Sequence, residues 1–185
     1  MAECPVSPRD VVNFWFSDES RERWFRSTPE YDARVRSRFE VAWELARDGA
    51  LADWEQSATG ALALVILLDQ VPLNMFRDQP ASFSTEALSR TVAEHAIARG
   101  FDHDVASDRQ AFFYLPCMHS ELLADQDRSV ELFGQPGLEQ NLEWARHHRE
   151  IVQRFGRFPH RNAIFGRTST PAEIQWLDSA DAFNP

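Results

Sequence analysis

The sequence predicts an all-α fold. Apolar residues recur at helical spacing along most of the 185 residues, no segment keeps the apolar–polar alternation of an amphipathic strand, and short loops separate the periodic segments. Hydrophobic residues make up 43% of the chain, enough for a core without disulfide or metal support. Because no linker-like stretch divides the chain, we expect one domain, residues 1–185, with about seven to eight helices.

Capping residues mark the first two helices. The pairs Ser7–Pro8 and Thr28–Pro29 each place a hydroxyl before a proline, and Asp10 follows Ser7 by three residues. A hydroxyl caps the free N–H groups of a first helical turn, and proline suits its first position. The second of these helices should be amphipathic, because apolar residues recur every three or four positions until Gly49.

The most hydrophobic helix is expected at residues 57–70 and should be the central one, since it has little polar surface. A serine capping signal at Ser107, with Gln110 three residues later, predicts a helix that kinks or restarts at Pro116. The other helices are expected at about residues 84–100, 127–133 and 138–155, the last ended by Gly156, and from Thr170 through Trp176.

The charge balance excludes several functions. The net charge is −10 and all 19 basic residues are arginines, which rules out a lysine Schiff base or a phosphate-binding P-loop lysine. An acidic chain argues against binding to nucleic acid or to an anionic membrane. The segment from Trp144 to Arg167 is the exception, because its six arginines and one acidic residue give it +5, which leaves −15 on the remainder.

Cysteine content and the N-terminal sequence favour a cytoplasmic location. Cys4 and Cys117 cannot form a disulfide framework or a closely spaced dithiol. The first ten residues lack a basic region followed by an apolar one, so we expect no signal peptide. The longest uncharged run, residues 56–68, has 13 residues, too short to span a bilayer and typical of a buried helix.

Two polar clusters lie on apolar segments. In the first, LDQVPLNMFR, Asn74 and Arg77 are candidate ligand-binding residues; the alternative, which we favour, is a helix end with a tight turn at Pro72. In the second, FFYLPCMHSE, we assign His119 and Glu121 as candidate acid–base residues. A core histidine that donates to a backbone carbonyl is the alternative for His119.

The third cluster, WARHHREIVQRFGRFPHRNAIFGR, has the highest density of functional residue types. His148 falls on the apolar face of its helix, while a loop of arginines, a histidine and an asparagine follows. Arginine forms bidentate bonds with carboxylates and phosphates, so the loop predicts an anion site; pairing with acidic residues elsewhere in the chain is the alternative. The candidate ligand-binding residues are His148, Arg157, Arg161, Asn162 and Arg167, with His160 as a third candidate acid–base residue.

Three blocks carry a resemblance to a known family: LDQVPLNMFR, FFYLPCMHSE and FGRFPHRNAIFGRTSTPAE. They are similar to the signature blocks of the bacterial family called domain of unknown function nine-two-four, and the resemblance covers nearly the whole chain. It implies an all-α, TPR-like antiparallel helical array and supplies no activity or catalytic residues. Leu73 stands where the family usually has an arginine.

Three functions follow as hypotheses. The third in rank is RNA binding, for which Trp144, Phe155 and Phe158 of the +5 segment are stacking groups, but the −15 remainder opposes it. The two leading hypotheses are ligand binding and peptide binding. In the first, a cleft lined by the HSE helix and the GRFPHRN loop binds a small phosphorylated or carboxylated ligand, with acid–base chemistry by His119, Glu121 and His160 if a reaction follows. In the second, a concave helical surface binds a protein or peptide without catalysis. The sequence identifies no cofactor and no oligomeric state, and although His119, His148 and Glu121 are metal-binding types, nothing brings them together, so we assign no metal ligand.

Overall fold

The computed structural model describes residues 4–180 and 182. Every regular element among these residues is helical, which confirms the predicted fold class. The described residues form two compact units: unit 1 contains residues 4–77 and 81–116, and unit 2 contains residues 78–80, 117–180 and 182. The single domain expected from the sequence stays a prediction. Each unit is described by itself.

Unit 1 begins with the two helices whose capping signals the sequence shows. The Ser7 hydroxyl accepts from the backbone N–H of Asp10 in a capping box, and the Thr28 hydroxyl accepts from that of Tyr31. The predicted starts of both helices are therefore confirmed. The helical segments are α1 (Pro8–Trp15), α2 (Asp18–Arg21), α3 (Pro29–Arg47), η1 (Ala52–Gln56), α4 (Ala58–Val65), η2 (Ile66–Gln70), α5 (Val71–Met75), η3 (Pro80–Phe83), α6 (Glu86–Ala98) and α7 (Ser107–Met118), of which η3 and α7 each include residues of both units.

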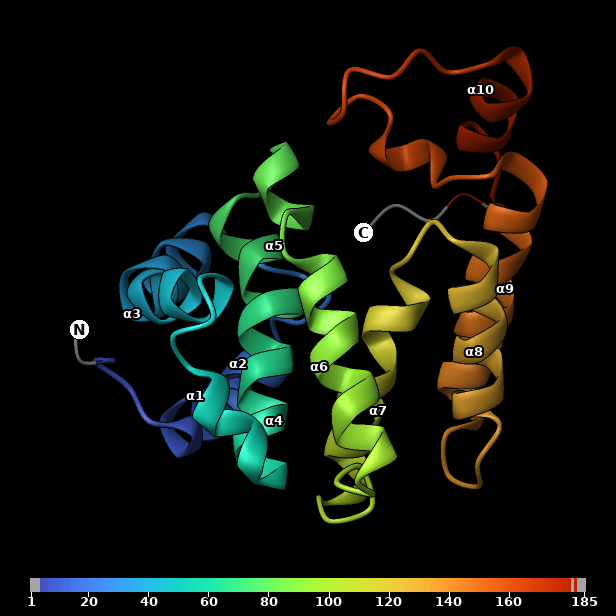
Figure 1. The fold of residues 1–185 in the computed structure, drawn as a ribbon. Helices are drawn as coiled ribbons and strands as arrows, with labels where there is room; N and C mark the ends of the chain where they lie inside the picture. Colours follow the sequence, from blue (N-terminus) through green and yellow to red (C-terminus); the bar gives the residue numbers. More distant parts are fainter. Residues whose placement is uncertain (1–3, 181, 183–185) are drawn as a thin grey trace. The chain divides into compact units, whose positions relative to one another are not determined.

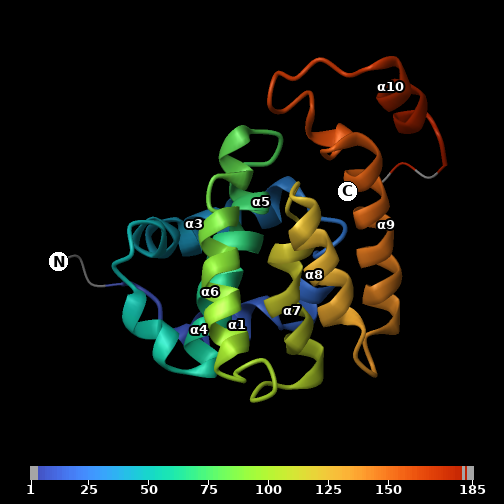
Figure 2. The same ribbon diagram turned by 45° about the vertical axis from the view of Figure 1, so that its right-hand side comes forward.

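The central helix of unit 1 is the continuous rod formed by α4, η2 and α5, as the sequence predicts. It packs against α1, α3, α6 and η1 (Figures 1 and 2). By length and composition the segment Ala58–Met75 could cross a membrane, with a mean hydropathy of 1.4, but 78% of it is buried in the structure, as in the core helix of a globular unit. The cytoplasmic location stays a prediction.

The expected tight turn at Pro72 is wrong, because the helix continues through this residue. Pro72 lies in the first turn of α5, directly after the π-helical η2. In an α-helix, residue 72 would donate its N–H to the carbonyl of Leu68, and proline has no N–H. That carbonyl instead accepts from the Thr85 hydroxyl at 2.6 Å, and the same hydroxyl accepts from the indole N–H of Trp43 at 3.2 Å. A side chain from outside the rod therefore replaces the missing backbone donor.

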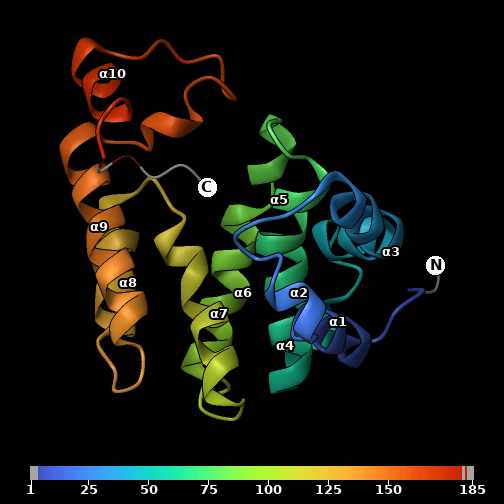
Figure 3. The same ribbon diagram turned by 180° about the vertical axis from the view of Figure 1, so that it is seen from behind.

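Unit 2 is built on a pair of antiparallel helices. α8 (Leu123–Phe133) and α9 (Glu139–Phe155) lie side by side in all three views (Figures 1, 2 and 3). As predicted, α9 ends before Gly156, which caps the helix with φ +71°, and α8 begins four residues before the expected start. The 3₁₀ turn η4 (Pro159–Arg161) and the short helix α10 (Pro171–Leu177) follow. α10 starts with the capping box of Thr170 and Glu173, confirming the expected start.

The buried Thr85 hydroxyl can be tested with a substitution of equal size. Thr85→Val leaves the Leu68 carbonyl and the Trp43 N–H without a partner, so the free energy of unfolding should fall by about 1 to 3 kcal/mol. Thr91→Val on α6 is the matched control, because the Thr91 hydroxyl is exposed and bonds only to the Ala87 carbonyl one turn earlier. Its effect in denaturant titration should stay within about 0.5 kcal/mol; equal effects would contradict the role of Thr85.

Candidate functional site

The arginine loop, residues 156–167, is the part of unit 2 that the sequence marks as a site. Its backbone folds on itself: the N–H groups of Arg161, Asn162 and Arg167 donate to the carbonyls of Phe158, Pro159 and Asn162 at 3.1, 3.0 and 2.8 Å. The Asn162 side chain is 2% exposed and donates to the Ser169 hydroxyl at 3.0 Å. These bonds give the loop a defined conformation from which its arginines extend.

Arg157 forms an ion pair with Glu173, the buried residue of the α10 capping box. Its Nε and Nη2 atoms donate to the two carboxylate oxygens at 2.7 and 2.9 Å, and Nη2 also donates to the Thr168 carbonyl at 3.0 Å. Glu173 is 2% exposed. The bonds from Arg157, reinforced by the Thr170 N–H, lower the pKa of Glu173 to about 2. The pair fixes the loop to the start of α10.

Arg167 forms the second bidentate pair, with Glu121. The expected HSE helix is wrong, because α7 ends at Met118 and Glu121 lies in the non-helical segment between α7 and α8. Its Nη1 and Nη2 atoms donate to Glu121 at 2.7 and 2.9 Å, and the backbone N–H of Phe158 donates to the same carboxylate at 2.8 Å. Burial acts to raise the pKa of Glu121, but these bonds and the charges of Arg167 and Arg161 outweigh it and hold that pKa below its usual value. Glu121 is therefore ionised at neutral pH and connects the segment before α8 to the loop.

Phe158 is the buried centre of the loop. It is 1% exposed and packs with Ile151, Val152 and Trp176 in the hydrophobic core of unit 2. The Arg161 guanidinium lies 4.8 Å from the centroid of its ring, and Arg161 is itself buried. The predicted ligand-binding residue Arg161 is thus in contact with the core.

The imidazole rings of His148 and His160 each lie 5.5 Å from the Phe158 ring. Burial lowers the pKa of His148 to about 3, although its Nδ1 bonds to the Trp144 carbonyl at 2.8 Å. Burial and the charge of Arg161 lower the pKa of His160 to about 4. Both rings are neutral at pH 7. A core histidine bonded to a carbonyl, the alternative raised for His119, therefore occurs at His148.

His119 belongs to the same group, because its charge contributes to the lowered pKa of both His148 and His160. The next residue, Ser120, is held by α8: the Gln126 amide donates to the carbonyl of Ser120 at 2.6 Å and to that of Met118 at 2.8 Å. In the part of the chain that the structure describes, no group of three or more His, Cys, Asp or Glu side chains is arranged to hold a metal ion.

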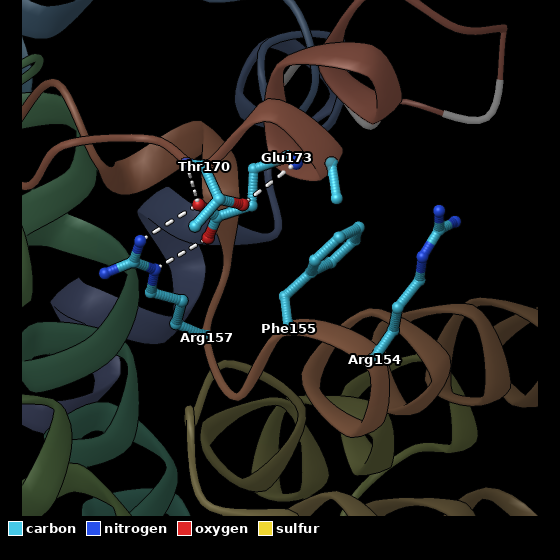
Figure 4. A pocket seen from close by; sticks show the side chains of 6 residues that line it. Arg154, Phe155, Arg157, Thr170 and Glu173 are labelled. Carbon is cyan, nitrogen blue, oxygen red and sulfur yellow. Dashed lines mark hydrogen bonds and ion pairs between the residues drawn. The ribbon is translucent and has the colours of Figure 1, made fainter.

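An open pocket lies beside the arginine loop, between the end of α9 and the start of α10 (Figure 4). Its volume is about 370 Å³. The Arg154 guanidinium lies 4.8 Å from the centroid of the Phe155 ring, and the Arg154 side chain makes no hydrogen bond or ion pair with any other described residue. The lining residues are Arg154, Phe155, Arg157, Thr170, Ala172 and Glu173.

The sequence did not select Arg154 as a candidate. It lies on the last turn of α9, at an exposed position among several exposed arginines, and only the neighbouring α10 makes it part of a pocket. Its position two residues before Gly156, where a helix ends and a loop begins, was the available signal.

Two predicted ligand-binding residues, Asn74 and Arg77, belong to unit 1 and bind Asp32. The Asn74 amide and Arg77 Nε donate to its carboxylate at 2.7 and 2.8 Å, and the Ser27 hydroxyl donates at 2.6 Å. Burial acts to raise the pKa of Asp32, but these three partners outweigh it, so the pKa lies below its usual value. The cluster joins the loop before α3 to the end of the central rod.

The fold and the arginine loop define an all-helical protein with a carboxylate-paired arginine cluster near its C-terminal helix. The chain belongs to the family described as "Bacterial protein of unknown function (DUF924)", whose model matches residues 11–181. This confirms the family resemblance seen in the sequence blocks. The TPR-like arrangement implied by the resemblance stays a prediction.

One solved structure supports the same family assignment. The chain is similar to the protein of unknown function ATU0120 from Agrobacterium tumefaciens, with a TM-score of 0.88 and 41% sequence identity. The match covers 92% of this chain and 96% of that one. No curated protein matches the chain.

The Arg157–Glu173 pair gives a pH-dependent prediction. Glu173→Gln should lower the free energy of unfolding by about 1 to 3 kcal/mol at pH 7, because a charge-assisted pair becomes a weaker hydrogen bond. The pKa of Glu173 falls from 4.5 to about 2 on folding, so its contribution is complete above pH 4.5 and is lost as the pH falls toward 2. The difference between wild type and variant should shrink over that window in denaturant titrations.

Glu150→Gln is the matched control, since Glu150 is exposed on α9. Its effect should stay within about 0.5 kcal/mol at every pH. A Glu173→Gln effect that remains constant from pH 7 to pH 3 would show that the carboxylate charge does not stabilise unit 2.

Proposed function

We propose that the protein binds a small molecule bearing an anionic group in the pocket between α9 and α10. The observation that carries the proposal is the pocket itself, with the guanidinium groups of Arg154 and Arg157 on two sides of Phe155 (Figure 4). Its volume of about 370 Å³ falls within the range of small-ligand sites, roughly 300 to 1,000 Å³. The sequence predicts an anion site at the arginine loop, and the proposed site also includes the end of α9.

Arg154 is the proposed anchor. A guanidinium group presents a planar fork of N–H donors that fits carboxylate and phosphate oxygens. No carboxylate among the described residues binds the guanidinium group of Arg154. Its position over the Phe155 ring limits the motion of an otherwise flexible side chain. Binding an anion here therefore breaks no existing ion pair.

The arginines of the loop contribute through their charge. Arg157 is engaged by Glu173 and Arg167 by Glu121, so each anion-binding fork already holds a carboxylate. Arg161 adds a buried positive charge against Phe158. Three guanidinium groups and two carboxylates leave one net positive charge on the loop and its partners, which favours an anion over a cation in its vicinity.

Binding without chemistry is the form of the proposal that the electrostatics favour. A general acid or base works best when its pKa lies near the working pH. The pKa of His160 is about 4, and Arg167 and the Phe158 N–H hold that of Glu121 below its usual value against the effect of burial. The acid–base role of His119, Glu121 and His160 stays a prediction from the sequence.

The alternative function, peptide binding, has less support. Among the described residues of unit 2, the exposed large apolar side chains are Leu122, Leu123, Trp144, Phe165 and Ile174. Only Leu122 and Leu123 are adjacent in the chain, and exposed apolar residues this scattered are usual on protein surfaces. A pocket lined by an arginine that has no carboxylate partner among the described residues is a more specific feature than these exposed apolar side chains.

The test of the proposed site is isothermal titration with sodium acetate, inorganic phosphate and phenylacetate at low ionic strength. At least one of these anions should bind, and Arg154→Ala should weaken that binding about tenfold or more, because it removes a charge-assisted contact of about 1.5 kcal/mol. Arg146→Ala is the matched control, since Arg146 is exposed on α9 and does not line the pocket.

The control variant should bind as the wild type does. Failure of all three anions to bind, or equal affinities in the wild type and the Arg154→Ala variant, would overturn the proposed function.

A further inference from the structure

We infer that the ligand is a monoanion with an apolar body, such as an aromatic or branched aliphatic carboxylate, and not a phosphate ester. This inference rests on the proposed function and adds the chemical class of the ligand. Two properties of the pocket carry it: the charge available to an anion and the apolar surface around that charge.

The pocket offers one uncompensated positive charge. Three charged side chains line it: Arg154, Arg157 and Glu173. Arg157 and Glu173 neutralise each other through two hydrogen bonds of 2.7 and 2.9 Å, which leaves Arg154. A carboxylate brings a single negative charge, whereas a phosphate ester brings about −1.5 to −2 at pH 7. The second charge would lie in a pocket that already contains the Glu173 carboxylate.

The surface next to Arg154 is apolar and fixed. Phe155 is half-buried, and its ring lies 5.7 Å from that of Trp176, a core residue. Ala172 adds a methyl group to the lining. Each methylene group of a ligand that is buried on such a surface raises affinity about fourfold. An anion with an apolar body therefore gains affinity that a small hydrophilic anion does not.

The size of the pocket agrees with this class of ligand. The volume of about 370 Å³ lies within the range of small-ligand sites, roughly 300 to 1,000 Å³, so the pocket has room for a carboxylate that carries one ring.

The experiment compares four probes by isothermal titration: phenylacetate, acetate, phenyl phosphate and phenethylamine. Phenylacetate should bind at least tenfold more tightly than acetate and phenyl phosphate, and phenethylamine, which has the ring but a positive charge, should not bind. Phenylacetate binding should weaken about tenfold or more in the Arg154→Ala variant.

A second variant tests the pocket without removing a charged residue. Ala172→Asp introduces a carboxylate into the lining and should abolish phenylacetate binding. Ala172 is exposed at the second position of α10, where aspartate is favourable, so the variant should fold. Ala124→Asp is the matched control, because Ala124 is exposed at the second position of α8 and does not line the pocket. It should bind phenylacetate as the wild type does.

The outcomes separate the inference from the proposed function. Tighter binding of phenyl phosphate than of phenylacetate, lost in the Arg154→Ala variant, would overturn the ligand class and leave the proposed function standing. Equal affinity for acetate and phenylacetate would overturn the inference that the ligand has an apolar body. Unchanged phenylacetate binding by the Ala172→Asp variant would overturn the placement of the binding site in the pocket between α9 and α10. Absence of any binding that depends on Arg154 would overturn both.

Discussion

Two bidentate ion pairs hold the arginine loop of unit 2. Arg157 binds Glu173, which caps α10, and Arg167 binds Glu121, which precedes α8. Together with the packing of Phe158 against Trp176, these pairs hold the loop, the last helix and the segment before α8 in their positions within unit 2. Arg154, at the end of α9, also borders a pocket, and its guanidinium group has no carboxylate partner among the described residues.

The electrostatic design of the loop differs from that of a general acid–base site. The histidines beside Phe158, the buried His148 of α9 and the partly buried His160 of the loop, are neutral, and the carboxylates that pair with the loop arginines are ionised. Such groups neither gain nor lose protons near neutral pH, so they supply a constant field in place of proton transfer. A constant positive field is suited to holding an anion, which is why the proposed function is binding.

The features that the sequence predicts correctly are local ones. Ser7, Thr28 and Thr170 mark helix starts because a cap and its N–H partner are three residues apart, and Gly156 ends α9 because only glycine adopts its φ readily. The partners of the arginines could not be predicted, since Glu121 and Arg167 are 46 residues apart. The turn expected at Pro72 was wrong for a similar reason. The hydroxyl that replaces the missing N–H belongs to Thr85, which lies 17 residues beyond Leu68, whose carbonyl accepts the bond.

The pairing and packing of the loop arginines also affect how trypsin can cleave the protein. Trypsin cleaves after lysine or arginine, and this chain has no lysine, so every tryptic site is an arginine. Arg157, Arg161 and Arg167 lie in a folded loop, paired with carboxylates or packed on Phe158, whereas Arg146 and Arg154 are exposed on α9. A protease needs an extended backbone, so cleavage within the loop requires it to open first. When the loop recloses faster than trypsin cuts it, the rate at which those peptide bonds are cleaved reports the population of the open loop in the native protein.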